Sequence, residues 1–260
     1  MSKTHLIIPD QHADPRFHNE RADWVGKLIL DLKPDVVVNM GDTADLSSLS
    51  LYDKGKASFY GRSYQKDIES HLDFQDRMWS PLKKAKKRWP FSVVLEGNHE
   101  HRIKRALELD PHLKGDKYGV SFNDLGFNDY YHEIVEYEAS TPGIIDIDGI
   151  DYSHYFISGV MGRAIGGEHH AASLIDKNYK SSTCAHSHLV DYAVRSKSGG
   201  QKLMGLVCGV YQDYRTPWAG ATNDLWWSGV VIKRNVEDGC YDPQFVSLAA
   251  LRKEYGSDKA

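Results

Sequence analysis

Short apolar runs that end on polar residues recur along the chain and predict buried strands. Residues 5–9, 35–40 and 92–95 are rich in aliphatic and β-branched side chains, which is typical of strands in a buried parallel sheet. Between the first two runs, apolar residues recur at helical spacing over about 17–32, and this spacing predicts a helix. A strand, a helix and a strand in succession form a βαβ unit, so the ends of the two strands should lie side by side.

The remaining pattern predicts one domain over residues 1–251, with a helical and irregular insertion at about 43–90 and a polar tail at 252–260. Within the insertion, apolar residues on one face predict a helix over 65–88 that Pro81 breaks or restarts. The other expected elements are helices at 100–109 and 168–178, a hairpin at 144–154 that turns at Asp148-Gly149, a flexible glycine-rich loop at 159–167, and strands at 182–185, 191–197, 202–210, 226–236 and 245–248.

Composition and charge narrow the class of protein. A chain of 260 residues that is 41% hydrophobic can bury one substantial core. Its formal charge of -4 provides no global attraction to nucleic acid, so any grip on nucleic acid must be local. The three widely spaced cysteines favour reduced thiols over a disulfide framework or a zinc site. No apolar stretch approaches the ~18 residues of a membrane span, and we expect a cytoplasmic protein without membrane contact.

Side chains that can bind metal ions follow five of the predicted strands. They are Asp10 and His12, Asp42, Asn98 and His99, His154, and His186 and His188. In open α/β sheets the functional crevice lies at the carboxyl ends of the strands, so we expect these groups to converge. Each has an ordinary alternative, because Gly-Asn turns after strands and structural histidines are both common. Five such coincidences favour a shared site.

The kinds of ligand narrow the chemistry further. Carboxylate, amide and imidazole groups without a thiolate suit Mn²⁺, Fe or Zn²⁺, and a single carboxylate such as Asp42 can bridge two ions. Two ions ~3.5–4 Å apart clamp a phosphoryl group and generate a hydroxide at neutral pH. We therefore expect two divalent ions, Mn²⁺ first, with Fe, Zn²⁺ or Ni²⁺ as alternatives, and hydrolysis of a phosphoester by a metal-bridging hydroxide.

The same residues carry a resemblance to the calcineurin-like metallophosphoesterases. That family's pattern is D-x-H, GD-x-x-D, GNH-[DE], a later single His, and GH-x-H. The chain contains all five motifs in this order, as Asp10-Gln11-His12, Gly41-Asp42-Thr43-Ala44-Asp45, Gly97-Asn98-His99-Glu100, His154, and Ala185-His186-Ser187-His188. The surrounding phrases look most like compact versions encoded by bacteriophages, which would place the protein in the host cytoplasm.

The resemblance implies a four-layer α/β/β/α sandwich with two mixed β-sheets. It also implies two metal sites that share Asp42, the first completed by Asp10, His12 and His188, the second by Asn98, His154 and His186. His99 would be the general acid at the leaving oxygen or a hydrogen-bond donor in the transition state, and Asp45 would hold its imidazole.

Three positions depart from the family pattern. Ala185 replaces the usual glycine, which is tolerable if its backbone stays in a region that L-residues adopt. Leu46 and Glu96 stand where related protein phosphatases carry phosphate-binding arginines. The absence of those arginines argues against a phosphatase that acts on phosphoserine or phosphothreonine.

Other side chains are candidates for holding the substrate. Arg102 lies one turn after a metal motif and could fork onto a phosphate, and Arg163 in the glycine-rich loop could be a second phosphate contact. The ordinary alternative for Arg102 is a solvent-exposed helix face, and this is the interpretation we prefer for its neighbour Arg105. For Arg163 the ordinary alternative is a charged residue that keeps a surface loop soluble. Aromatic residues follow the last motif; they are Tyr211, Tyr214, Trp218, Trp226 and Trp227. They could stack on nucleobases, or they could pack in the core or at a subunit interface.

The sequence therefore favours a dinuclear metal-dependent phosphodiesterase that acts on nucleic acid or nucleotides. A phosphomonoesterase acting on a nucleotide, a small molecule or a phosphoprotein is the alternative enzyme. A non-catalytic, metal-stabilised binding module could share the fold, but such a module is expected to have lost ligands or the acid, and none is missing here.

Overall fold

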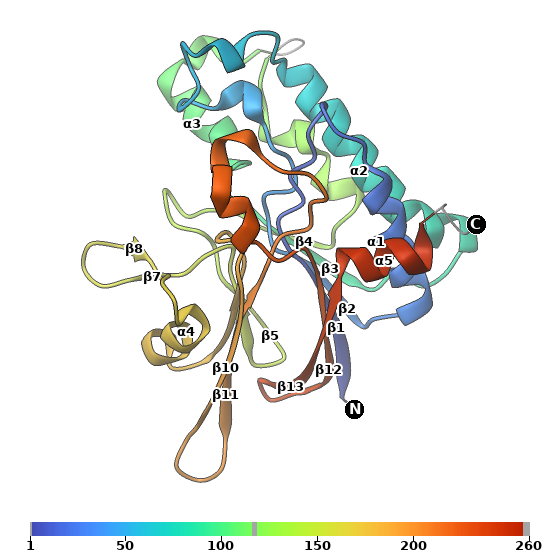
Figure 1. The fold of residues 1–260 in the computed structure, drawn as a ribbon, viewed down its shortest axis with the longest axis vertical. Helices are drawn as coiled ribbons and strands as arrows, with labels where there is room; N and C mark the ends of the chain where they lie inside the picture. The colour runs from blue at the N-terminus through green and yellow to red at the C-terminus, as the bar shows by residue number, and fades with distance from the viewer. Residues whose placement is uncertain (1, 116–118, 257–260) are drawn as a thin grey trace.

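A computed structural model describes residues 2–115 and 119–256 of the chain. Two large mixed β-sheets face each other, and helices cover both outer surfaces (Figure 1). Apolar side chains from both sheets, including Ile7, Val38 and Leu206, form the core between them. The four-layer α/β/β/α sandwich that the resemblance implies is therefore confirmed.

The first sheet has six strands, and its central strands are parallel. Their order is β13 (Cys240–Ser247), β12 (Gly229–Glu237), β1 (Lys3–Ile8), β2 (Val36–Asn39), β3 (Phe91–Leu95) and β4 (Glu133–Val135). Strand β12 pairs antiparallel with β1, which makes the sheet mixed. The predicted adjacency of the first two strands is confirmed, and the carboxyl ends of β1, β2 and β3 lie at one edge.

The second sheet has five strands, three of which run parallel. Their order is β10 (Val190–Ser196), β11 (Lys202–Cys208), β9 (Ser181–Cys184), β6 (Ile150–Tyr152) and β5 (Ile145–Ile147). Strands β5 and β6 form the predicted hairpin around Asp148-Gly149. The expected glycine-rich loop at 159–167 includes part of a small projecting hairpin, in which β7 (Ile157–Ser158) pairs with β8 (Arg163–Ala164).

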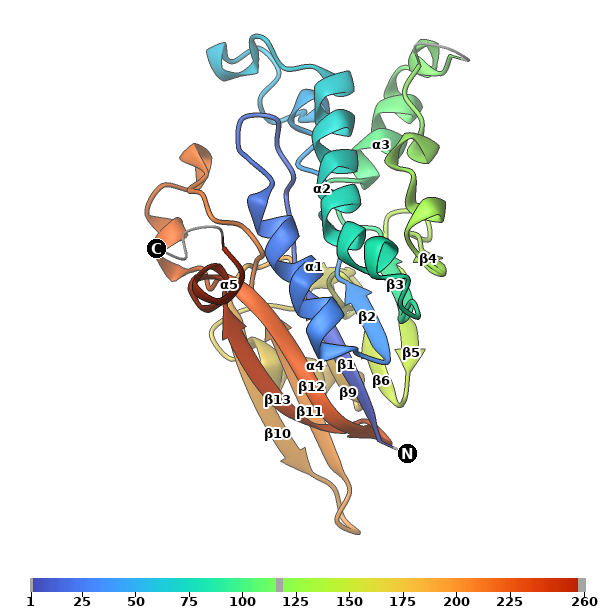
Figure 2. The same ribbon diagram turned by 90° about the vertical axis from the view of Figure 1, so that its right-hand side faces the viewer.

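Helices α1 (Glu20–Leu32), α2 (Tyr64–Ala85) and α5 (Leu248–Tyr255) cover the first sheet, while α4 (His170–Asn178) covers the second (Figure 2). The prediction that Pro81 interrupts its helix is wrong, because α2 continues through it. A Cβ on Gly26 of α1 would lie 2.4 Å from the carbonyl oxygen of Met78 and 3.1 Å from Pro81 Cγ. Helix α1 therefore lies directly against the turn of α2 that contains the proline.

Short elements complete the chain. Helix α3 (His101–Leu109) directly follows the Asn98-His99 motif. The 3₁₀ helices are η1 (Ser47–Leu49), η2 (Ala57–Phe59), η3 (Pro111–Leu113), η4 (Phe122–Leu125), η5 (Phe127–Asp129) and η6 (Pro217–Leu225).

The three cysteines are free thiols, as expected. Helix α5 reaches Tyr255, so the first part of the expected polar tail is helical, and residues 257–260 lie outside the described part. None of the helices described is both long and apolar enough to cross a bilayer.

Candidate metal centre

The carboxyl ends of parallel strands from both sheets supply the predicted ligands. Strands β1, β2 and β3 lead into the first three motifs, and β6 and β9 of the second sheet lead into the last two. The structure brings these side chains together in overlapping groups whose ligand atoms all lie within 4.8 Å of one another. The groups are Asp10, His12 and His188; Asp42, His154 and His186; and His12, Asp42 and His99.

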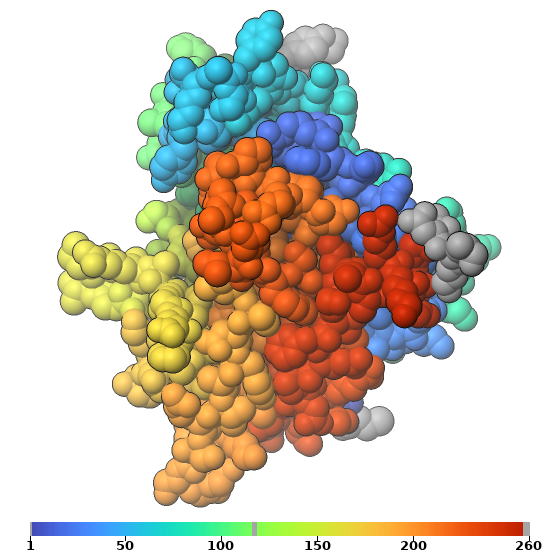
Figure 3. Space-filling model, in the orientation of Figure 1, coloured from blue at the N-terminus to red at the C-terminus, as the bar shows by residue number. Residues whose placement is uncertain are grey.

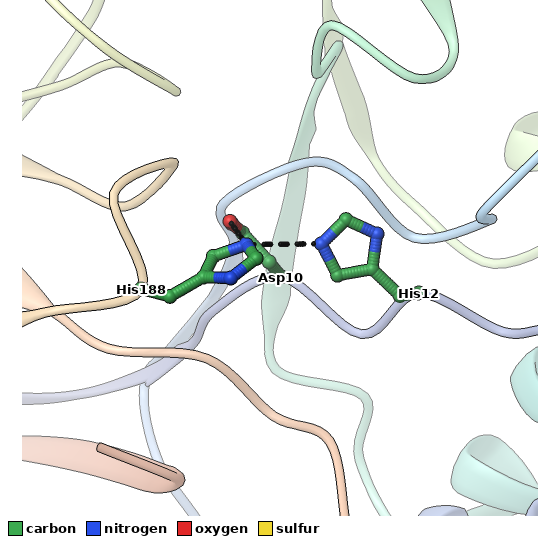
Figure 4. Close-up of side chains that lie close together, drawn as sticks. All are labelled: Asp10, His12 and His188. Carbon is green, nitrogen blue, oxygen red and sulfur yellow. Dashed lines mark hydrogen bonds and ion pairs between the residues drawn. The ribbon is translucent and has the colours of Figure 1, made fainter. Parts of the chain in front are cut away.

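In the first group, Asp10, His12 and His188 point toward one another (Figure 4). The Nε2 atom of His188 lies 3.1 Å from Asp10 Oδ2 and 3.1 Å from His12 Nε2. Two ligand atoms that are each ~2.1 Å from a metal ion and at right angles to one another lie ~3 Å apart. The three side chains are therefore spaced like neighbouring ligands around a single ion.

The second group has the same spacing. Asn98 Oδ1 lies 3.0 Å from His154 Nε2 and 2.8 Å from His186 Nδ1, and His154 Nε2 lies 3.5 Å from Asp42 Oδ2. His154 and Asp42 are buried whereas His186 is exposed, so this group faces solvent on one side. An amide oxygen, a carboxylate and two imidazoles converge here, and this donor set fits a divalent ion.

Asp42 connects the two groups. Its Oδ2 atom, which faces His154, also lies 3.9 Å from His12 Nε2 of the first group. The buried Oδ1 atom of Asp10 has no hydrogen-bond partner, although an unpaired buried carboxylate oxygen is costly. A cation between these carboxylates would satisfy both, so the residues fit a pair of ions that share Asp42.

The electrostatics of the site keep the acids ionised and two of the imidazoles neutral. Burial alone would raise the pKa of Asp10 and Asp42, but the surrounding histidines hold both below the ordinary value. Burial lowers the pKa of His12 to about 3. Although part of His186 is exposed, its ring lies against the other side chains of the site, and this partial loss of solvent together with the charge of His154 lowers its pKa to about 4. Burial also opposes a charge on His154, yet the neighbouring Asp42 raises its pKa to about 10. A divalent cation would replace that proton as the partner of Asp42.

Backbone contacts aim the ligands. The Nδ1–H group of His154 donates to the carbonyl of Met40 at 2.8 Å, which leaves Nε2 facing the site. The backbone N–H of His186 donates to Asp10 Oδ2 at 3.0 Å. Four of the predicted ligands have left-handed backbones, with φ values between 44° and 64°; they are His12, Asp42, His186 and His188. Such strain clusters at functional sites, whereas Ala185 avoids it, so its methyl group is tolerated.

His99 and Asp45 lie beside the ligands, and Asp45 contacts the His99 ring through its backbone as well as its side chain. The Nδ1 atom of His99 lies 2.7 Å from the backbone carbonyl oxygen of Asp45 and 3.4 Å from its Oδ1. The Arg102 guanidinium lies 2.9 Å from His99 Nε2 and donates to the Asp45 carbonyl at 2.8 Å. Because a guanidinium only donates, Nε2 accepts this bond and a neutral His99 carries its proton on Nδ1.

The remaining substrate candidates are not all at the centre. Arg163 is exposed on β8, in the hairpin that projects from the body of the molecule (Figure 3). Among the described residues, no hydrogen bond or ion pair joins Arg163 to the predicted ligands. The departure at Glu96 is also explained, because its buried carboxylate binds Lys104 Nζ and the Tyr137 N–H, each at 2.6 Å. Glu96 therefore holds the end of β3 in place.

Glu100 is the main residue to which the sequence analysis assigns no role. Its Oε2 atom accepts from the backbone N–H groups of Asp42 at 2.9 Å and Gly97 at 2.8 Å. Its Oε1 atom accepts from the Thr43 N–H, the Thr43 hydroxyl and the Ala44 N–H. This buried carboxylate thereby ties the loop after β2 to the end of β3. The sequence did contain a sign of this role, because an acidic residue ends the third motif.

A buried polar chain supports the Asp10–His12 loop from helix α2. Gln75 Nε2 donates to Gln11 Oε1 at 3.1 Å. Gln75 Oε1 accepts from the Tyr131 hydroxyl at 2.7 Å. The same hydroxyl accepts from Asn39 Nδ2 at 2.8 Å. The side chain between the two ligands of the first motif is thus fixed by a helix far along the chain. Spacing in the sequence cannot indicate such a contact.

Arg16 is a second cation near the centre that the sequence did not single out. Its guanidinium binds the buried carboxylate of Asp14 and lies 4.0 Å from Asp45 Oδ2. The side chain is 50% exposed, so it reaches solvent beside Asp45. Its position makes it a candidate contact for a bound phosphate.

Comparisons with known proteins add only distant likenesses. No family model matches the chain, and no curated protein matches it. Similar solved structures include a conserved uncharacterized protein, a predicted phosphoesterase, from Streptococcus pneumoniae TIGR4, with 11% identity, a TM-score of 0.38 and coverage of 96% of this chain and 91% of the other. They also include the protein TT1561 of Thermus thermophilus, with 9% identity, a TM-score of 0.38 and coverage of 94% and 99%. At this level the likeness says nothing about what this chain does.

The contacts of Glu100 generate a stability prediction. Glu100→Gln places an amide NH₂ against backbone donors, so at least two buried N–H groups lose their acceptor. We expect a loss of about 1–3 kcal/mol in the free energy of unfolding, measured by urea denaturation. Glu108→Gln, an exposed glutamate on α3, is the matched control and should stay within about 0.5 kcal/mol of the wild type. Equal stability of the two variants would contradict the bracing role.

Proposed function

We propose that the chain is a dinuclear metal-dependent phosphodiesterase that acts on nucleic acid or nucleotides. The observation that carries the proposal is the single oxygen of Asp42 that faces both ligand groups, at 3.5 Å from His154 Nε2 and 3.9 Å from His12 Nε2. A shared carboxylate is a feature of paired divalent ions. Asp10, His12 and His188 would complete one site, and Asn98, His154 and His186 the other.

Bound divalent ions would supply an activated water and would neutralise the charge of the phosphoryl group. The chain's own residues position the substrate and handle the proton. The buried carboxylates of Asp10 and Asp42 lie among histidines, so this pocket is preorganised for cations and for the phosphate oxygens they attract. Asn98 adds a neutral side-chain amide at the more open edge of the site.

His99 is the proposed group at the leaving oxygen, and Arg102 controls its proton. In the state described, His99 Nε2 accepts a hydrogen bond from Arg102 and has no proton to donate. When a phosphate draws the guanidinium away, Nε2 is free to take up a proton from solvent water and to donate it to the leaving oxygen. The Asp45 carbonyl continues to orient the ring through Nδ1. Arg102 would thus link substrate binding to the acid.

The preference for a diester is supported by the cations around the centre. A phosphomonoester dianion carries an additional negative charge, which additional guanidinium groups would stabilise. Here Arg16 shares its charge with Asp14, and Arg102 reaches a phosphate only by leaving the Asp45 carbonyl and His99. A singly charged diester makes the smaller demand on such a site. A phosphomonoesterase remains the competing enzyme, and the assay below separates the two.

The first test compares two esters with the same leaving group. With added Mn²⁺, we expect kcat/KM for bis(p-nitrophenyl) phosphate to exceed that for p-nitrophenyl phosphate by roughly tenfold or more, which corresponds to ~1.4 kcal/mol of transition-state binding. Chelation with EDTA should abolish both activities, and Mn²⁺ should restore them. A faster reaction with the monoester would overturn the diesterase assignment.

The sharing of Asp42 predicts how many ions the protein holds. Wild-type protein should bind two Mn²⁺ per chain, measured by elemental analysis after equilibrium dialysis. Asp42→Asn keeps the shape but removes the charge, so the affinity for both ions should fall by more than about 100-fold. Asp176→Asn, an exposed acid on α4, should retain both ions. Full double occupancy in Asp42→Asn would refute the bridging role.

The role of His99 predicts a dependence on the leaving group. His99→Ala should keep both metal ions and lose about 10²- to 10⁴-fold in kcat for diesters with alkyl leaving groups, because these need a proton. The loss should be much smaller with p-nitrophenolate, which leaves without one. His169→Ala, an exposed histidine beside α4, is the control. Equal losses for both classes of leaving group would exclude the acid.

A further inference from the structure

The segment after β11 is attached to the metal centre at both of its ends. The backbone N–H of Tyr211 donates to the Asp10 carbonyl at 2.8 Å, and that of Trp227 donates to the His188 carbonyl at 3.1 Å. Both acceptors belong to proposed ligands of one ion. The intervening residues, coloured orange in Figure 3, form part of the molecular surface. The position of this segment is therefore fixed relative to the ion site.

Side-chain hydrogen bonds also hold the segment together internally. Asn223 Oδ1 accepts from the Thr216 N–H at 2.9 Å, while its Nδ2 donates to the carbonyls of Thr216 at 3.0 Å and Gly220 at 2.8 Å. Arg215 and Asp224 form an ion pair across the same turn. Side chains carried on this loop are therefore presented in a preorganised arrangement, which lowers the entropic cost of binding a ligand.

The aromatic residues of the segment divide into two sets. Tyr211 is fully buried, and Tyr214 stacks on Phe17 with ring centroids 3.8 Å apart, so both serve packing. Trp226 instead lies with its ring 4.3 Å from that of the proposed ligand His188. Trp218 lies 5.9 Å beyond Trp226 and is 71% exposed. A row of two indoles thus leads from the metal centre to solvent.

The planes of the two indoles are inclined at 58°, so a base can lie flat on one ring only. We propose that Trp218, supported by Trp226, forms a stacking platform for the nucleobase of the nucleotide whose phosphate occupies the metal centre. The inference rests on the proposed function and names its substrate class more closely. An aromatic face stacks on any base and contributes ~1–3 kcal/mol per base, so the platform favours nucleotides without reading their sequence. Because the net charge is -4, electrostatic attraction to a long phosphate backbone contributes little to binding. Stacking on one base would provide binding energy that charge does not.

The test uses two diesters that differ only in the base-bearing group. The substrates are the p-nitrophenyl ester of thymidine 5′-monophosphate and methyl p-nitrophenyl phosphate, both assayed with Mn²⁺. Trp218→Ala should lower the ratio of their kcat/KM values by roughly 5- to 150-fold, the equivalent of one lost stacking contact. Trp218→Phe should recover most of the ratio. Tyr179→Asn removes a ring that is 77% exposed on the far side of α4 and is the matched control. An unchanged ratio in Trp218→Ala, as expected of a tryptophan that serves only a protein contact, would overturn the platform.

A binding measurement separates this inference from the proposed function. Calorimetry should show that Mn²⁺-loaded protein binds AMP more tightly than ribose 5-phosphate, and that Trp218→Ala weakens AMP binding alone. If wild-type protein hydrolyses neither ester yet shows this preference, the phosphodiesterase proposal fails and the platform stands. If both esters are hydrolysed but AMP and ribose 5-phosphate bind equally well, the platform fails and the enzyme assignment stands.

Discussion

A buried carboxylate with every lone pair occupied determines how the two halves of the metal centre meet. Glu100 has no exposed surface, and its two oxygens accept from donors at the ends of both β2 and β3. A charge can remain buried only where such donors surround it. The carboxylate in turn joins the two loops that carry Asp42 and Asn98, because it satisfies backbone N–H groups of both. The ligand geometry thus depends on a residue that does not face the site.

Close approach of the strands is the second condition, and glycine provides it. A Cβ on Gly97 would lie 2.2 Å from the backbone nitrogen of Asp42, and a Cβ on Gly41 would lie 2.7 Å from the backbone nitrogen of Gly97. Because glycine has no side chain at either position, the loops after β2 and β3 can lie against each other. The loops after β1 and β2 are also joined, since the N–H groups of Gln11 and His12 both donate to the Asp42 carbonyl. The metal centre is therefore framed largely by backbone contacts.

The sequence predicted the fold and the convergence of the ligand-type residues because strand ends carry a strong local signal. The apolar runs before Asp10, Asp42 and Asn98 imposed parallel strands, and parallel strands share an edge. Contacts over long sequence separations carry no such signal. Pro81 of α2 packs against Gly26 of α1, a residue far from it in the sequence, and the hydrogen bond from His99 to the Asp45 carbonyl is set by the conformation of the loop after β2. The roles of individual ligands and the division of the chain into domain, insertion and tail remain predictions.

The polar chain from Gln11 through Gln75 to Tyr131 and Asn39 has a consequence for how this protein can change. It runs through the interior from the turn between Asp10 and His12 to a helix within residues 43–90. Removing that stretch, by evolution or by engineering, would leave the Gln11 amide and the Tyr131 O–H group without their Gln75 partner and would loosen the turn between Asp10 and His12. Length in this region is therefore constrained by the loop that carries Asp10 and His12, and shortened descendants would need new partners for the Gln11 amide and the Tyr131 hydroxyl.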